Sequence, residues 1–141
     1  MAEAEMKDNS AKVKAEIMRK ARRAMRIVGM KAESYAKALS PVDTGLLRNS
    51  ITFALGGGKT STQIYTSDSG DTAGSYEMEA PADNESEVTL YVGTNVHYAP
   101  YQELGHNPVN GKFVQPQAFL RPAMENHKDE YERIIQQEMN K

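Results

Sequence analysis

The sequence contains no cysteine among its 141 residues. This absence excludes disulfide bonds, cysteine-ligated zinc and thiol catalysis, so stability has to come from packing or from partner subunits. The sequence also lacks any apolar run near the ~20 residues that cross a bilayer, and residues 1–10 are charged where a secretory signal would be apolar. We therefore expect no membrane span and synthesis in the cytosol.

The length of the chain suits one domain with one hydrophobic core. We predict a single domain over residues 1–141, with a flexible N-terminus over residues 1–10. Charge is unevenly spread: residues 1–50 carry eleven Lys/Arg and six Asp/Glu, residues 51–87 carry one and seven, and the remainder carries five and six. This segregation suits complementary faces between copies of the chain or a basic face toward DNA, although a solvated helix face beside an acidic loop explains it as well.

A long amphipathic helix is predicted to end at Leu39. Apolar residues recur at steps of three and four from Val13 to Leu39, and the helix stops at Ser40 because Pro41 removes an amide donor. A short helical turn should follow, with Asp43 or Thr44 as its cap. The other positions of the long helix are mainly basic. The candidates for contact with DNA are Lys12, Arg19, Arg22, Arg23 and Arg26.

Three segments in the middle of the chain have the composition of strands. Residues 51–55 and 63–66 flank a glycine-rich turn region, which predicts a hairpin between them. Residues 88–92 alternate apolar and polar side chains, which predicts a half-buried strand ending at Gly93. The acidic residues 67–87 have little to bury, so we expect a long exposed loop or a distorted extension of the hairpin.

The end of the chain predicts a closing helix. Apolar residues recur at helical spacing from Arg121 onward, and Pro122 suits the first turn of a helix. Turn-forming residues at 107–111 predict a second loop before it. Together these elements predict an α+β fold: a long N-terminal helix, a small antiparallel sheet with a long acidic loop, and a C-terminal helix packed on the sheet.

The sequence offers little for catalysis. Residues 58–60 (GKT) resemble the end of a phosphate-binding loop, but Phe53 stands where that loop needs its first glycine. A metal site is conceivable only at His97, Glu103 and His106, which lack the spacing of a helical metal pair. The nucleophile elbow of serine hydrolases is absent. We predict no catalytic, metal or cofactor-binding residue, and a metal-dependent hydrolase is the weakest alternative.

Three blocks follow one another along the chain: PVDTGLLRNSI at residues 41–51, VGTNVHYAPYQELG at residues 92–105 and QPQAFLRPA at residues 115–123. Together they resemble the neck proteins of long-tailed bacteriophages, which are also called head-tail joining, minor tail or tail-completion proteins. The chain departs from that pattern at His106, where threonine is common, and in its longer acidic segment before Val88. The resemblance implies a structural protein of the virion and not an enzyme.

The resemblance also implies partners and a place of action. We expect copies of the chain to form a ring, by resemblance a hexamer, that joins the head connector to the tail around the DNA passage. The other partners would be head-closure or connector proteins and tail-terminator or tail-tube proteins. The alternatives are a tail terminator or a minor tail assembly protein and, less favoured, a freestanding DNA-binding protein that uses the basic helix.

Four residues of the second and third blocks are candidates for the subunit interface. Tyr98 and Tyr101 carry amphipathic rings of the kind that interfaces favour. Glu103 and Arg121 are candidates for ion pairs between copies of the chain. Tyrosines that cap the core, and ion pairs within one chain, explain the same residues equally well.

Overall fold

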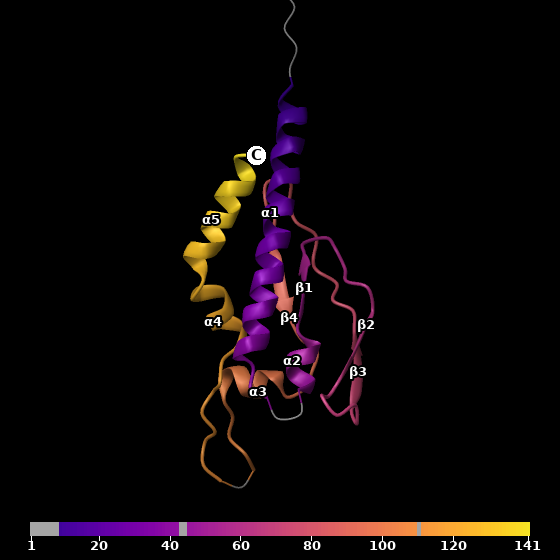
Figure 1. Ribbon diagram of the computed structural model, residues 1–141, viewed down its shortest axis with the longest axis vertical. Helices are drawn as coiled ribbons and strands as arrows, with labels where there is room; N and C mark the ends of the chain where they lie inside the picture. The colour runs from indigo at the N-terminus through magenta and orange to yellow at the C-terminus, as the bar shows by residue number, and fades with distance from the viewer. Residues whose placement is uncertain (1–8, 43–44, 110) are drawn as a thin grey trace, which may run out of the picture.

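The computed structural model describes residues 9–42, 45–109 and 111–141 (Figure 1). Its longest element is helix α1, Ser10–Leu39, which confirms the predicted long helix. The buried side of α1 is built mainly from alanine and valine, including Ala24, Val28 and Ala32. The helix ends where Ser40 takes an extended conformation ahead of Pro41, as the sequence predicts. The predicted flexible N-terminus falls outside the described residues for residues 1–8.

The first turns of α1 extend beyond the rest of the molecule (Figure 1). Val13 and Ile17 belong to the apolar face of the helix, yet they are 55% and 47% exposed. The apolar face is covered only from Ala24 onward, where other elements pack against it. Amphipathic spacing therefore predicts the helix correctly but overstates how much of its apolar face is buried.

The strands form two separate two-stranded antiparallel sheets. Strand β1, Thr52–Leu55, pairs with β4, Leu90–Gly93, and β2, Gln63–Thr66, pairs with β3, Ala73–Tyr76. The predicted hairpin between residues 51–55 and 63–66 is therefore wrong. β1 is mostly buried, because α1 packs on the sheet of β1 and β4 and Met78 and Ala80 pack against Ala54, whereas β2 is mostly exposed.

The acidic segment is more ordered than a continuous exposed loop, so that prediction is corrected for part of its length. Residues 73–76 form β3, and the chain then crosses the sheet of β1 and β4. Met78 and Ala80 are buried against Ala54, with Tyr91 beside them. These two apolar side chains, together with backbone hydrogen bonds from Thr60 N–H to Met78 O and from Ala80 N–H to Gly58 O, hold the segment on the sheet. Average composition does not show such contacts.

The end of the chain forms two helices where one was predicted: α4, Leu120–Glu125, and α5, Lys128–Met139. The helical path breaks at Asn126 and His127. Helix α5 lies alongside α1 (Figure 1), and its Tyr131 packs against Val28 and Ala32. Its main neighbour is thus α1, while Leu90 and Val92 of β4 reach the same cluster from the sheet.

Two short helices complete the fold. Helix α2, Leu46–Ser50, follows the first turn region, and α3, Ala99–Leu104, follows β4. The proposed caps of α2, Asp43 and Thr44, lie outside the described residues. The largest core cluster joins α1, α2, α3 and α4. Its members are Ala36, Leu47, Ile51, Val96, Ala99, Phe119 and Ala123. The mixed α+β class is confirmed.

No helix in the described ranges has the length and apolar character needed to cross a membrane.

Candidate functional site

Glu103 joins the second block to the third at one end of the molecule. Its Oε2 accepts hydrogen bonds from the backbone N–H groups of Phe119 and Leu120 at 2.8 and 3.0 Å, and its Oε1 accepts one from Arg121 at 2.9 Å. The first N–H groups of a helix have no partner inside the helix. The carboxylate of α3 therefore caps the start of α4.

The environment of Glu103 has opposing effects on its acidity. Burial alone would raise the pKa of this carboxyl group. The three backbone N–H donors and the nearby charge of Arg121 together outweigh burial, so the pKa lies below its ordinary value. Glu103 is thus a carboxylate at neutral pH, and its negative charge is stabilised by groups of its own chain.

The structure brings the four candidate interface residues to one corner, which we call the α3 corner: Tyr98, Tyr101, Glu103 and Arg121. Tyr98 is half-buried and packs against the main core cluster, while Tyr101 is 54% exposed with its ring 5.3 Å from that of His106. Arg121 is exposed, and its backbone is fixed by Glu103. Tyr101 and Arg121 are therefore available to a neighbour, whereas Tyr98 and Glu103 mainly serve this chain.

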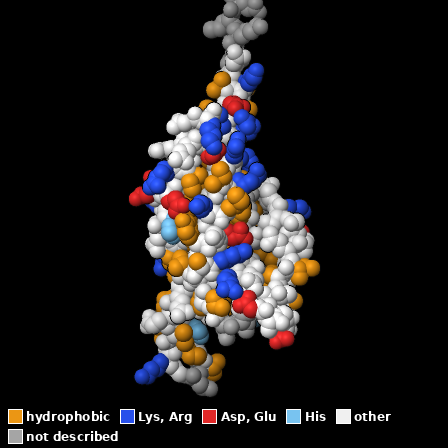
Figure 2. Space-filling model, viewed as in Figure 1, with side chains coloured by type: hydrophobic (Ala, Val, Ile, Leu, Met, Phe, Trp, Pro, Cys, Tyr) orange, Lys and Arg blue, Asp and Glu red, His pale blue; other side chains and the backbone are white. Residues whose placement is uncertain are grey.

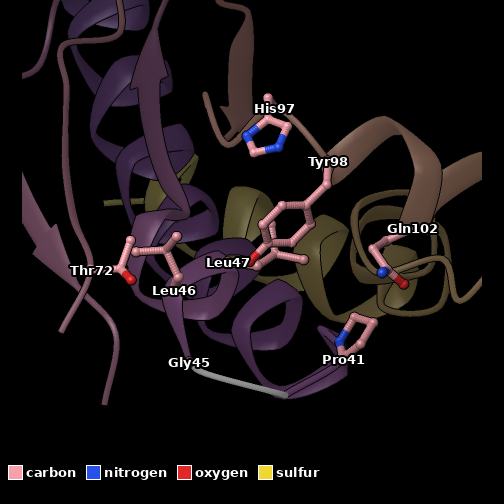
Figure 3. A pocket seen from close by; sticks show the side chains of 8 residues that line it. All are labelled: Pro41, Gly45, Leu46, Leu47, Thr72, His97, Tyr98 and Gln102. Carbon is pink, nitrogen blue, oxygen red and sulfur yellow. The ribbon is translucent and has the colours of Figure 1, made fainter. Parts of the chain in front are cut away.

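A pocket of about 440 Å³ lies where the first and second blocks meet (Figure 3). Figure 3 shows Leu46 and Leu47 on one side and Tyr98 and Gln102 on the other, with His97 at the edge. The remaining lining residues are Pro41, Gly45 and Thr72. The described lining combines apolar side chains with the hydroxyl groups of Thr72 and Tyr98, the amide of Gln102 and an imidazole at the edge.

The conceivable metal site does not form. Both carboxylate oxygens of Glu103 already accept hydrogen bonds from backbone N–H groups at the start of α4. Across residues 9–42, 45–109 and 111–141, no three His, Asp or Glu side chains gather as metal ligands would. Lys59, in the GKT sequence, lies 3.4 Å from Glu77 and forms an isolated bridge with Glu79, so no helix follows it.

The basic side chains of α1 gather over its N-terminal half (Figure 2). Three of the five candidates for DNA contact already have acidic neighbours in this chain. Arg19 binds Glu16 at 2.5 Å, Arg22 lies 3.9 Å from Asp83, and Arg23 lies 3.4 Å from Glu138. Lys12 and Arg26 make no ion pair within the described part of the chain.

The acidic segment partly neutralises α1 within one molecule. Besides the contact of Asp83 with Arg22, Glu85 lies 3.5 Å from Lys14. The Lys14–Glu85 pair is exposed and contributes little to stability, whereas the side chain of Asp83 in the other pair is only 10% exposed. These pairs show that the charge segregation of the sequence serves contacts inside the chain as well as a basic surface.

Two asparagines, for which the sequence indicates no role, attach the sheet of β2 and β3 to the rest of the molecule. The amide of Asn49 donates to the carbonyl of Thr66 at 2.7 Å, and that of Asn95 donates to Ser75 at 2.8 Å. Asn95 also accepts from the Tyr65 hydroxyl at 2.6 Å. Both asparagines lie inside the blocks that carry the family resemblance, which was the only signal for them.

A family model covers residues 4–105, which include α1, both sheets and the first two blocks. The family is described as "Bacteriophage HK97-gp10, putative tail-component". The chain belongs to this HK97-gp10-like family. Its members are structural components of the bacteriophage tail, so the chain is a virion protein that works with other phage structural proteins and its family points away from enzymatic activity. No curated protein and no solved structure gives a significant match.

Proposed function

We propose that this HK97-gp10-like chain forms a ring in the neck or upper tail that joins the head connector to the tail around the DNA passage. The observation that carries the proposal is the family match over residues 4–105, in which two of the three neck-protein blocks lie. The third block is tied to the second through Glu103. The second and third blocks thus build one structural unit, the α3 corner.

The proposed contact between ring neighbours uses the exposed side of the α3 corner. Tyr101 presents an aromatic ring that is 54% exposed, and Arg121 presents a guanidinium group. Tyrosine and arginine are enriched where protein interfaces carry most of their binding energy. Glu103 accepts a hydrogen bond from the Arg121 backbone and Tyr98 packs against the main core cluster, so both residues fix the position of this surface. By resemblance to the neck proteins, the ring would hold six copies.

The proposed contact with DNA uses the N-terminal half of α1. Lys12, Arg19, Arg22, Arg23 and Arg26 would meet phosphates without reading sequence. A salt titration of duplex binding by the assembled protein tests this part, since phosphate contacts predict a steep loss of affinity as salt increases. A variant with Lys12→Gln and Arg26→Gln should bind more weakly than the original chain, and Lys128→Gln, at an exposed position of α5, is the control. If the protein does not bind duplex DNA at low salt, the proposed DNA contact is wrong, whereas the proposed ring is unaffected.

The experiment that tests the proposal is electron microscopy of phage lysates with and without an early stop codon in the gene. We expect filled heads separated from tails of normal length, because a joining ring acts after both parts are built. Overlong or absent tails would instead support the alternative role of tail terminator or tail assembly protein. A plasmid copy of the intact gene is the control, and it should restore joined particles. Normal infectious particles from the mutant would contradict both roles.

A further inference from the structure

The apolar face of α1 continues past the part of the helix that the rest of the described chain covers. Val13 and Ile17 lie on the same side of the helix as the buried Ala24 and Val28, because residues four or seven positions apart share a face. Helix α5 runs beside α1 and ends below these first turns (Figure 1). Val13 and Ile17 are therefore an apolar surface that α5 leaves uncovered.

The charges beside this surface are positive. Lys20 follows Ile17 by three positions and lies on the same side of the helix. Lys14 is 3.5 Å from Glu85 of its own chain, whereas Lys20 joins no ion pair in the described part. We call Val13, Ile17 and Lys20 the α1 tip. Two tips brought together would repel each other, so the charge favours an acidic partner surface.

The outer side of the β2–β3 sheet, and of the stretch that follows it, carries the opposite charge. Residues 60–111 contain no lysine or arginine, and residues 67–87 contain seven Asp/Glu. Met78 and Ala80 are buried against the sheet of β1 and β4, whereas Glu77 and Glu79, which alternate with them, are exposed. Lys59 lies 3.4 Å from Glu77, but Glu79 joins no ion pair among the described residues. The negative charge of Glu79 is therefore open to a partner.

An exposed apolar residue lies on this same outer side. Ile64, which is 79% exposed, pairs with Ser75 in the register of β2 and β3, and paired residues point to the same face. Thr62, two residues before Ile64, donates a hydrogen bond to Glu77 at 2.9 Å, so Glu77 lies on that face too. We call this surface the acidic face. It consists of four exposed residues: Ile64, Ala73, Glu77 and Glu79.

We infer that the α1 tip of one copy docks on the acidic face of a second copy. The apolar residues of the tip would cover Ile64, and Lys20 would lie against Glu79, so that both the apolar surfaces and the charges are complementary. The tip and the acidic face lie far apart along the longest axis of the molecule (Figure 1), so they do not meet within one chain. Since the two surfaces are unlike, the contact is head-to-tail and can repeat around an axis, as a ring requires.

The contact leaves the proposed DNA surface free. Because successive residues of a helix are rotated by about 100°, Arg19, Arg22 and Arg26 point away from the side that carries Val13. One side of α1 can thus meet a neighbour while another faces DNA. This inference rests on the proposed ring and adds a second contact between neighbours to that of the α3 corner.

A charge exchange tests the contact in the assembling phage. The phage with the stop codon is supplied with a plasmid copy that carries Lys20→Glu. We expect the infectious titre to fall by at least about tenfold, because like charges then meet at every interface of the ring. Adding Glu79→Lys to the same copy should restore the titre. The matched control combines Lys20→Glu with Glu132→Lys at an exposed position of α5, which gives the same net charge and should leave the titre low.

Three results would overturn the inference: an unchanged titre with Lys20→Glu, no rescue by Glu79→Lys, or equal rescue by Glu132→Lys. Each of them would leave the ring intact, because the stop-codon phenotype tests the ring independently. Circular dichroism of the purified Lys20→Glu chain should show the same helix content as the original chain, which separates a lost contact from a lost fold.

Crosslinking tests the same contact in particles that keep these charges. The chain has no cysteine, so a pair of introduced thiols is specific. The stop-codon phage is supplied with two plasmid copies, one with Val13→Cys and one with Ile64→Cys. Purified particles are treated with a short bis-maleimide, which links thiols without the strict geometry of a disulfide. We expect mass spectrometry to identify links between position 13 of one copy and position 64 of another.

The matched control for crosslinking is Met30→Cys in place of Val13→Cys. Met30 lies on the same helix and is equally exposed, at 55%, but it lies outside the α1 tip. This control should give no link to position 64. Assembled particles without a link between positions 13 and 64, or with equal yields from both pairs, would overturn the inference.

Discussion

The carboxylate of Glu103 accepts three hydrogen bonds, all from backbone N–H groups at the start of α4. Replacing it by glutamine keeps one acceptor oxygen but removes the charge and one of the two acceptors. Hydrogen bonds to a charged group contribute about 1.5–3 kcal/mol each, so Glu103→Gln should lower the free energy of unfolding by about 2 kcal/mol. Urea denaturation measures this change. Glu87→Gln, at an exposed position, is the control and should stay within about 0.5 kcal/mol of the original.

The contribution of Glu103 to the free energy of unfolding should depend on pH. The pKa of Glu103 is lower in the folded chain than its ordinary value of 4.5, so the carboxylate stabilises the fold above pH 4.5 and this contribution is lost as pH falls further. The difference in unfolding free energy between the original chain and Glu103→Gln should therefore be largest near neutral pH and shrink below pH 4.5. Urea denaturation over a pH series measures it. A difference that stays constant down to acid pH would show that the charge of Glu103 is not what matters.

Among the elements, α1 was the most predictable because its apolar period repeats over seven turns or more and proline ends it. Its partners were not predictable in the same way. Residues 51–55 were paired with the nearest strand along the chain, whereas their true partner β4 lies more than thirty residues away. Strand pairing depends on which faces are buried, and local composition does not record that. The break between α4 and α5 was missed because the apolar spacing continues across it.

A glycine inside α1 tests how closely the helix meets the sheet. A Cβ added at Gly29 would lie 2.4 Å from the ring of Phe53 and 2.9 Å from Leu90. Alanine is the better helix former by about 1 kcal/mol, so propensity alone predicts that Gly29→Ala stabilises the chain. We expect the opposite, a loss of about 1–3 kcal/mol, because the added methyl group forces β1 away from the helix. Ser34→Ala, on the exposed side of α1, is the control and should not destabilise. Thermal unfolding separates the two outcomes.

For the molecule as a whole, the sequence groups the candidate residues of the α3 corner correctly into two blocks but does not show which contacts each residue makes there. The second and third blocks contain all four residues of the α3 corner, and the bonds of Glu103 bring these two blocks together. Glu103 was assigned to ion pairing, since the N–H groups of a helix start are invisible in the sequence. The DNA candidates on α1 were chosen by charge alone, and the acidic neighbours of Arg22 and Arg23 depend on folding of distant segments. The interface role of the corner stays a prediction.

The two sheets differ in how firmly they belong to the rest of the molecule. The sheet of β1 and β4 packs under α1, whereas the sheet of β2 and β3 is mostly exposed and is held by the side-chain amides of Asn49 and Asn95. Elements with few buried contacts open before the whole chain unfolds. The β2–β3 sheet should therefore exchange its amide hydrogens by local opening, while the buried part of α1 exchanges only with global unfolding.

Removing the side-chain amide of Asn95 tests whether the β2–β3 sheet opens before the rest of the molecule. Asn95→Ala deletes the bonds to Ser75 and Tyr65, which should speed amide exchange in β2 and β3 on the order of tenfold while α1 keeps its rates. Asn107→Ala, at an exposed position between α3 and α4, is the matched control and should leave both sheets unchanged. Hydrogen exchange followed by NMR resolves the two regions. If β2, β3 and α1 all exchanged faster together, the second sheet would be part of the global folding unit, and its exposed surface would be as rigid as the core.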